Sequence, residues 1–181
     1  MRINKPCFFM ICTDKTEREC LEKNLFGGRE WVFPYMKTIK RKDIGFLINV
    51  DKDELIGIFI ADSEAQLDIE PNAWGGGFPA QIKVKLIGEL QRINNATSKL
   101  ENFLELKEIE KPTRSFFIPK MITYGPDITN KVLSLFKISP DVESQLQETE
   151  ETIVSIGFTL DKVAGLNEIK QFIYERIIAP F

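Results

Sequence analysis

The stretch PNAWGGGFPAQIKVKLIGEL, residues 71–90, decides the fold of this chain. From residue 78 to residue 86, apolar side chains occupy every second position, which is the period of a β-strand with one buried face. We therefore predict a strand over residues 78–87. The glycines at 75–77 allow a tight turn or a close approach to a ligand, because glycine has no Cβ that could clash. Trp74 stands before them, and two roles are open to it: a platform for ligand stacking, or a core side chain beside a turn.

The composition indicates a globular chain that binds rather than catalyses. Of its 181 residues, 43% are hydrophobic and 28% are charged, and the formal net charge is −3. These values are typical of one folded domain, and any basic surface must be local. The chain has no histidine, so it lacks the most common general base and metal ligand. Since spacing reveals no pair of catalytic carboxylates either, we predict no catalytic residue and no metal site.

The cysteines and the N-terminal apolar run indicate the cellular compartment in which we expect the protein. Three cysteines, at positions 7, 12 and 20, are odd in number and lack the spacing of a metal site. Such cysteines are typical of reduced thiols, and we expect a cytoplasmic protein. The apolar run at residues 7–12 is too short for a signal peptide or a membrane span, so no membrane partner is expected.

The other patterns predict a mixed α+β domain. Asp14 followed by Glu17 has the form of a capping box, which predicts a helix from residue 15 to about residue 24, ended by Gly27 and Gly28. Further strands are expected over residues 7–12, 44–50, 54–62 and 115–118. Short helices are expected around residues 99–106 and after residue 126.

The character of the chain changes near residue 138. Residues 139–151 are polar and acidic, which is typical of a linker or an exposed helix. Apolar residues then recur at helical spacing over residues 166–177. We divide the chain into a domain over residues 1–137, a linker over 138–154 and a further segment over 155–181.

Several separated motifs resemble the DCD (development and cell death) domain. They are LFG at 25–27, GIF at 57–59, PNAW at 71–74, FPAQIKVKL at 78–86 and IPKMITYG at 118–125. More remotely, the order of elements is similar to that of the EVE and YTH domains of the PUA-like group. In those families a small β-barrel flanked by helices holds a modified or flipped base in an aromatic cage. The resemblance implies a PUA-like barrel here, with nucleic acid as the ligand.

The same resemblance implies particular ligand-binding residues. The two cage aromatics correspond to Phe26 and Trp74, and the groups that touch the base edge correspond to Thr13 and Asp14. We add Phe78, which follows the glycines of the Trp74 loop. Two alternatives stay open, because Phe26 replaces the more usual Trp and suits a core position, and Asp14 suits a helix N-cap.

Phosphate contacts would come from basic residues near the same site. Lys83 and Lys85 share the solvent face of one predicted strand by parity. A basic stretch that follows the first helix could line the same opening. The full set of expected backbone contacts is Lys37, Lys40, Arg41, Lys42, Lys83 and Lys85.

The segment GFTLDKVAGLNEIKQFIYERIIAPF, residues 157–181, resembles the opening of an AAA+ ATPase module. The matching residues are Phe158, Asp161, Val163, Gly165, Leu166 and Pro180. For the parent protein this implies ATP, Mg²⁺ and a homohexamer. The glycine-rich phosphate-binding motif is absent from the 181 residues, so we expect this chain to be a fragment without ATPase activity and without a cofactor.

These observations favour a substrate-recognition domain of an AAA+ ATPase, with nucleic acid as its ligand. The alternative is a domain that binds client or adaptor proteins, for which Trp31, Phe33 and Tyr35 would form an aromatic patch. A third hypothesis is a small-molecule sensor that uses the pocket of Trp74.

Overall fold

The computed structural model describes residues 2–147. The chain divides into two compact units, Met1–Glu143 and Ser144–Phe181. All the predicted binding residues belong to the first unit. The AAA+-like segment over 157–181 and the helix predicted over 166–177 lie outside the described residues.

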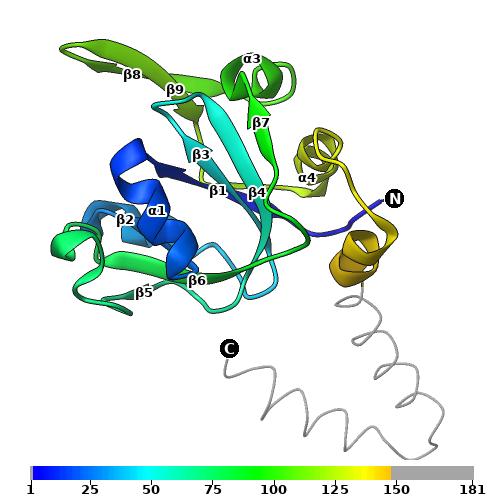
Figure 1. Ribbon diagram of the computed structural model, residues 1–181, viewed down its shortest axis with the longest axis horizontal. Helices are drawn as coiled ribbons and strands as arrows, with labels where there is room; N and C mark the ends of the chain where they lie inside the picture. The colour runs from blue at the N-terminus through cyan, green and yellow to red at the C-terminus, as the bar shows by residue number, and fades with distance from the viewer. Residues whose placement is uncertain (1, 148–181) are drawn as a thin grey trace, which may run out of the picture. The chain divides into compact units, whose positions relative to one another are not determined.

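An eight-stranded sheet forms the body of the first unit (Figure 1). Its strands are β1 (Cys7–Cys12), β2 (Leu25–Gly28), β3 (Ile44–Asn49), β4 (Glu54–Ala61), β5 (Gln66–Leu67), β6 (Ala80–Leu86), β7 (Arg92–Asn94) and β10 (Thr123–Tyr124). The strand order is β10-β1-β3-β4-β6-β2, with β5 on β6 and β7 on β4. Strands β1 and β3 are parallel, whereas β3 and β4 form an antiparallel pair.

Strand β4 is the point at which the sheet divides. Its first half pairs with β7 and its second half pairs with β6, so the two ends of one strand have different neighbours. Strand β6 in turn carries β2 and β5 at its beginning and β4 at its end. The sheet therefore curls into a half-barrel, which fits the normal twist of strands.

Helices and a separate hairpin complete the unit (Figure 1). The helices are α1 (Asp14–Glu22), α2 (Phe33–Met36), α3 (Ala96–Leu100) and α4 (Pro126–Leu133), with short 3₁₀ turns η1 (Glu30–Val32) and η2 (Ala73–Gly76). Strands β8 (Leu106–Lys111) and β9 (Arg114–Pro119) pair only with each other among the described residues, and they project beyond the half-barrel. No helix within residues 2–147 has the length and apolar character needed to cross a membrane.

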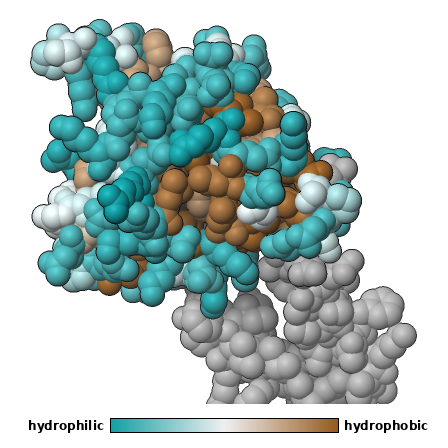
Figure 2. All heavy atoms as spheres, in the orientation of Figure 1, coloured by the Kyte–Doolittle hydropathy of each residue, from teal (hydrophilic) through white to brown (hydrophobic). Residues whose placement is uncertain are grey.

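The half-barrel has a hydrophobic core on each side of its sheet. Inside the curl lie fully buried side chains of the strands and of the segment after β2, among them Phe8, Phe26, Met36, Leu47, Phe59 and Ile82. On the other side, Phe46 stacks on Phe136 at 5.7 Å between ring centroids, and Phe9 lies 5.5 Å from Phe46. Hydrophilic side chains cover most of the face drawn in Figure 2, while hydrophobic ones gather over the middle of the sheet.

The predicted mixed α+β class and most of its strands are confirmed. The alternation in residues 78–87 is strand β6, in which Ala80, Ile82 and Val84 are buried. The segments predicted over 7–12, 44–50, 54–62 and 115–118 correspond to β1, β3, β4 and β9.

Three local predictions were wrong. The short helix expected around residues 99–106 is α3, which ends at Leu100, and Leu106 begins strand β8. The N-cap of α1 is Thr13 rather than Asp14, and the Thr13 N–H donates to Thr16 Oγ1 at 3.0 Å, so Glu17 does not close the box. Helix α1 ends at Glu22, before the predicted Gly27-Gly28 stop. Both glycines belong instead to strand β2, where they pair with β6.

Candidate nucleic-acid interface

Helix α1 holds Trp74 at two points. The Trp74 backbone N–H donates to Glu19 Oε1 at 2.9 Å, and the Trp74 indole Nε1–H donates to the Thr16 carbonyl oxygen at 3.2 Å. Trp74 has φ 48° and ψ 36°, the left-handed region that bulky residues seldom adopt. Strain of this kind is often found at functional sites, where surrounding contacts stabilise it.

The indole lies on the backbone of strand β2. A Cβ placed on Gly27 would lie 2.5 Å from Trp74 Cζ3, so the ring occupies the space that a side chain would need. The edge of the indole meets Phe78, with 5.8 Å between centroids and 88° between planes. Trp74 is partly buried and packs against the core. It is anchored like a core residue and is still partly exposed, so both roles that we considered from the sequence stay open.

Phe26 lies on the opposite face of β2. Its ring is fully buried and packs edge-on against Phe59 at 4.9 Å. Its cross-strand partner is Ile82, which faces the inside of the half-barrel. Because neighbouring residues of a strand point to opposite faces, Phe26 and the Gly27 surface under Trp74 are separated by the strand. The two aromatics predicted to form a cage are therefore not brought together.

Thr13 and Asp14 serve the start of α1. Asp14 Oδ1 accepts a hydrogen bond from Asn49 Nδ2 at 2.9 Å and lies 3.3 Å from Lys52 Nζ. The Asp14 N–H donates to Asp51 Oδ2 at 2.9 Å. With Thr13 as N-cap, both residues have structural partners of their own.

A partly buried ion pair next to Asp14 has no counterpart among the predicted site residues. Glu17 Oε1 accepts from Arg92 Nη2 at 2.5 Å, and Glu17 Oε2 accepts from Asn49 Nδ2 at 2.6 Å. Arg92 also donates to Glu54 Oε2 at 2.8 Å. The hydrogen bond from Arg92 lowers the pKa of Glu17. The network joins α1 to strands β3, β4 and β7, and we interpret its role as structural: it stabilises the packing of the helix on the sheet. No sequence pattern predicts this network, because Arg92 is remote from Glu17 along the chain.

Backbone pairing brings the predicted basic residues to one edge of the half-barrel. The Lys42 N–H donates to the Ala61 carbonyl at 2.8 Å, and the Asp62 N–H donates to the Lys83 carbonyl at 2.8 Å. Lys85 pairs with Ile60 in the same ladder. The basic stretch before β3 and the lysines of β6 thus meet at the end of β4.

The cations at this edge differ in their partners. Lys40 and Arg41 lie 3.9 Å from Glu64 and 3.6 Å from Asp62, in exposed pairs that contribute little to stability. Lys37 Nζ lies 4.8 Å from the centroid of the Phe33 ring. The remaining three have no carboxylate partner in the described part of the chain: Lys42, Lys83 and Lys85.

The strand register relates these lysines to the indole. Gly27 pairs with Gln81, so the surface under Trp74 belongs to the same face of the β2–β6 pair as Gln81. Lys83 and Lys85 follow Gln81 at intervals of two, with about 7 Å of strand between successive positions. An aromatic ring and two lysines that have no carboxylate partner within residues 2–147 therefore share one outer face of the half-barrel.

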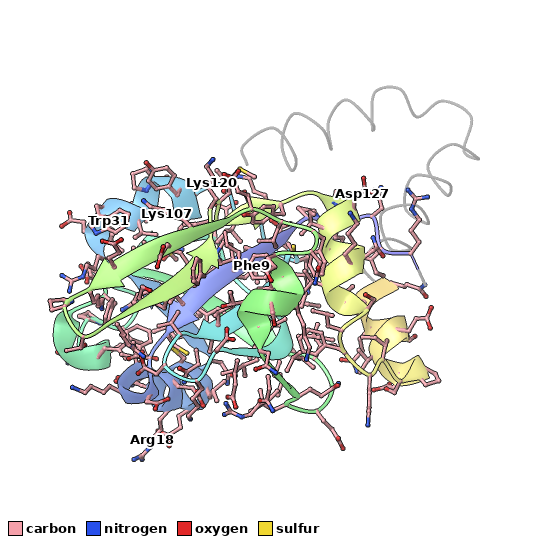
Figure 3. All side chains as sticks on the ribbon, turned by 90° about the horizontal axis from the view of Figure 1, so that it is seen from above. Phe9, Arg18, Trp31, Lys107, Lys120 and Asp127 are labelled. Carbon is pink, nitrogen blue, oxygen red and sulfur yellow. The ribbon has the colours of Figure 1, made fainter. Side chains whose placement is uncertain are left out.

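Two other aromatics are more exposed than Trp74. Trp31 in η1 is 70% exposed and Tyr35 in α2 is 61% exposed. Figure 3 shows Trp31 at the edge of the unit, whereas Phe9 of strand β1 lies in its interior. The third member of the predicted patch, Phe33, is partly buried against the core beneath the Lys37 ammonium.

Neither metal ligation nor thiol chemistry is evident around these residues. Within residues 2–147, no group of three Cys, Asp or Glu side chains is arranged to hold a metal ion. Burial raises the pKa of Cys7 and of Cys20 to about 12, and it also raises that of Cys12. These thiols are protonated at neutral pH and unsuited to nucleophilic attack.

Comparison with known proteins gives a family and a fold. The family described as the development and cell death domain matches residues 6–108, more than half of the chain. Comparison with curated protein sequences gives no match. The family match ends before the AAA+-like segment over 157–181 and gives that segment no support.

Three solved structures of YTH domains are similar to this one. The YTH domain protein mmi1 in complex with RNA has a TM-score of 0.53 and 9% identity, over 82% of this chain and 87% of that chain. The YTH domain of Zygosaccharomyces rouxii MRB1 in complex with N6-methyladenosine RNA has a TM-score of 0.52 and 13% identity, over 78% of this chain and 93% of that chain. The Pho92 YTH domain in complex with m6A has a TM-score of 0.54 and 15% identity, over 77% of this chain and 88% of that chain. At these identities the likeness concerns the fold, which is a mixed α+β half-barrel of the YTH type.

Proposed function

The chain belongs to the development and cell death domain family, and from that premise we propose that its half-barrel binds nucleic acid. The fold likeness supports this proposal, because the YTH domains it resembles were solved with RNA or with m6A. The observation that carries the proposal is the outer face of the β2–β6 pair. There the indole of Trp74, lying on Gly27, shares a face with Lys83 and Lys85.

The chemistry of this face suits a single strand. A base can stack on an aromatic ring, which contributes about 1–3 kcal/mol per base, while lysines spaced along a strand contact successive phosphates. Lys42 and the exposed Lys40 and Arg41 extend the cationic edge. Asp62 and Glu64 form only solvent-exposed ion pairs with Arg41 and Lys40, and such pairs are weak. A phosphate group can therefore replace either carboxylate as the partner of the cation.

A salt titration tests the proposal. Fluorescence anisotropy of labelled single-stranded RNA and DNA, modified and unmodified, should show binding that weakens as salt is added. In Lys83→Glu/Lys85→Glu, the slope of log K against log salt should fall in magnitude by about 1.4, since each phosphate contact on a single strand contributes about 0.7.

The matched control is Lys131→Glu, an exposed lysine on helix α4. It changes the net charge in the same direction and should leave the slope nearly unchanged. If no oligonucleotide binds more tightly than millimolar at low salt, the proposal fails.

Binding of a client protein is the second candidate. It is favoured by the exposure of Trp31 and Tyr35, which lie four residues apart in consecutive short helical turns. Large exposed aromatics of this kind are common at protein interfaces. A chain that fails to bind oligonucleotides, yet loses a partner protein on Trp31→Ser/Tyr35→Ser, would support this candidate instead.

We also propose that the domain delivers its ligand to an AAA+ ATPase. The support is the sequence resemblance of residues 157–181 alone. ATP hydrolysis and hexamer assembly, measured with and without oligonucleotide, test this part separately.

A further inference from the structure

The β8–β9 hairpin, which projects beyond the half-barrel in Figure 1, separates its charges onto two faces. Residues directly opposite each other in an antiparallel pair share a face, and successive residues of a strand alternate between faces. One face consists of three cross-strand pairs: Lys107–Ile118, Ile109–Phe116 and Lys111–Arg114. Glu108 and Glu110 are the acidic residues of the two strands, and both belong to the other face. We call the face with the three cations the cationic face.

Two cations lie directly opposite each other at the tip of the hairpin. Lys111 and Arg114 are cross-strand partners. Like charges at opposite positions destabilise a strand pair, whereas opposite charges stabilise it. Glu110 precedes Lys111 in the sequence but points to the other face, so it does not separate the two cations. The arrangement is unfavourable for the hairpin alone and favourable for contact with an anion.

An aromatic ring and a carboxylate hold these two cations in place. Lys111 Nζ lies 5.3 Å from the centroid of the Phe116 ring, and Arg114 Cζ lies 5.6 Å from the same centroid. Arg114 Nη2 also pairs with Asp51 Oδ1, in the turn between β3 and β4. Side chains that are already held in this way lose less conformational freedom when they bind a ligand.

The cationic face keeps donors that the rest of the domain does not use. Within residues 2–147, neither Lys107 nor Lys111 has a carboxylate at ion-pair distance. Both lysines are exposed, and Figure 3 labels Lys107 on the hairpin. The Arg114 guanidinium uses Nη2 for Asp51, and its other N–H groups have no hydrogen-bond partner in the described part of the chain. All three cations can therefore bind phosphate, which an arginine can contact through two donors at once.

The tip of the hairpin is attached to the helix that holds Trp74. Asp51 Oδ2 accepts the Asp14 N–H at 2.9 Å, at the start of α1, while its Oδ1 accepts from Arg114. The same helix accepts both hydrogen bonds from Trp74. Helix α1 has nine residues and is therefore about 14 Å long. One strand of about ten nucleotides can reach both regions.

We propose that the cationic face of the hairpin binds the phosphate groups of a bound single strand of nucleic acid. This inference rests on the proposed function and adds a second contact region to it.

Nucleic acid fits this face better than an acidic protein segment does, because its cations alternate with apolar side chains. Lys107 lies on one side of the Ile109–Phe116 pair, and Lys111 and Arg114 lie on the other. Cations interleaved with aromatic rings are typical of surfaces that bind single strands. A phosphate between Lys111 and Arg114 would also relieve the repulsion between them.

The experiment replaces the two lysines of the cationic face in Lys107→Gln/Lys111→Gln. The full 181-residue chain is titrated into a labelled single-stranded RNA of about ten nucleotides, within the usual range of single-strand sites, at several salt concentrations. The slope of log K against log salt should fall in magnitude by about 1.4, since two phosphate contacts of about 0.7 each are lost. Circular dichroism checks that the variant is folded.

The matched control is Lys131→Gln/Lys137→Gln, which removes two exposed lysines on and after α4 by the same substitution. It should leave the slope nearly unchanged. An unchanged slope in the hairpin variant would overturn the proposal, and so would an equal fall in the control. A poly-glutamate peptide of equal length that displaces the RNA at equal concentration would overturn it in favour of an acidic protein partner.

Comparison with Lys83→Glu/Lys85→Glu separates this proposal from the proposed function. If no oligonucleotide binds more tightly than millimolar at low salt, both fail. If the RNA binds and only Lys83→Glu/Lys85→Glu lowers the slope, the hairpin proposal fails alone. If only the hairpin variant lowers it, the hairpin proposal stands and the β2–β6 face is not the interface. A lower slope in both variants supports both contact regions.

Discussion

The indole of Trp74 occupies the side-chain space of Gly27, with its Cζ3 atom 2.5 Å from the point where a Cβ would lie. A loop residue and a strand residue far apart in the sequence thus form one surface. The contact is possible only because position 27 has no side chain. It fixes the indole on the outer face of β2, and the candidate interface depends on that placement.

Gly27→Ala should disturb this surface. The added methyl group must displace the indole, and such overpacking typically costs about 1–3 kcal/mol in the free energy of unfolding. Urea denaturation should measure the loss. The emission of Trp74 should change as well, which is seen most clearly in a Trp31→Phe background that leaves one tryptophan.

Gly77→Ala is the matched control in the same loop. Gly77 has φ −77°, and a Cβ there would come no closer than 3.4 Å to the Trp74 carbonyl oxygen. Its unfolding free energy should change by less than about 0.5 kcal/mol. Equal effects of the two substitutions would mean that the indole does not depend on Gly27.

The Glu17–Arg92 pair predicts a second effect on stability. Arg92→Met leaves the Glu17 carboxylate buried without its main partner. We expect a loss of about 2–3 kcal/mol, less than for a fully buried pair, because Arg92 is partly exposed. Arg18→Met, which removes an exposed partner of Glu22, should cost less than about 0.5 kcal/mol.

The pH dependence of this loss has a definite sign. Arg92 lowers the pKa of Glu17, so the pair stabilises the fold above the unfolded pKa of about 4.5 and loses that contribution as pH falls through the folded value. The difference in stability between the natural chain and Arg92→Met should therefore shrink below about pH 4.5. A difference that stays constant down to pH 3 would contradict this account of Glu17.

Elements with a strong pattern in their own residues were predictable from the sequence, whereas elements that depend on distant residues were not. Strands β3, β4 and β6 have strong apolar or alternating patterns, and they were found close to their true bounds. Strand β8 was missed, because LKEIEK has few apolar residues and its hairpin does not pack as a core strand. Asp14 and Thr13 are both good N-cap residues by type, and only the structure shows that Thr16 Oγ1 accepts the Thr13 N–H and makes Thr13 the cap.

The candidate site was less predictable than the fold. Parity along β6 correctly placed Lys83 and Lys85 on an exposed face. The separation of Phe26 from Trp74 depends on which face of β2 each residue occupies, and this requires the pairing of β2 with β6. Pro6, Asp43 and Tyr124 line one open cleft, and no spacing in the sequence relates these three positions.

Asp43 should affect the free energy of unfolding with a pH dependence opposite to that of Glu17. Burial raises its pKa above the ordinary 3.8, so the folded state binds its proton more tightly than the unfolded state does. Its contribution to stability is then largest at low pH and is lost as pH rises above 3.8 and through the folded pKa. Asp43→Asn should abolish this dependence and leave the chain at pH 7 as stable as the natural one or more so. A marked loss of stability at pH 7 would show that the charged form is favourable.

The three thiols should be unreactive until the domain unfolds. Cys7, Cys12 and Cys20 are all buried, and burial raises the pKa of each, so the thiolate that reacts is almost absent. A disulfide reagent such as DTNB should react slowly at pH 8 and release three equivalents quickly in denaturant. Fast reaction of even one thiol in the native state would indicate local opening around α1 or β1.

Trp74 allows its two roles to be measured separately. Trp74→Phe keeps an aromatic ring and loses the hydrogen bond to Thr16, so it should cost about 1 kcal/mol of stability. Trp74→Ala also loses the packing on Gly27 and Phe78, and about 2–4 kcal/mol is expected for a side chain that is only partly buried. If the ring also stacks on a base, oligonucleotide affinity should fall in the order Trp, Phe, Ala, measured by anisotropy at a temperature where each variant is folded by circular dichroism. A folded Trp74→Ala chain with undiminished affinity would leave Trp74 a purely structural residue and would move the interface to the lysines alone.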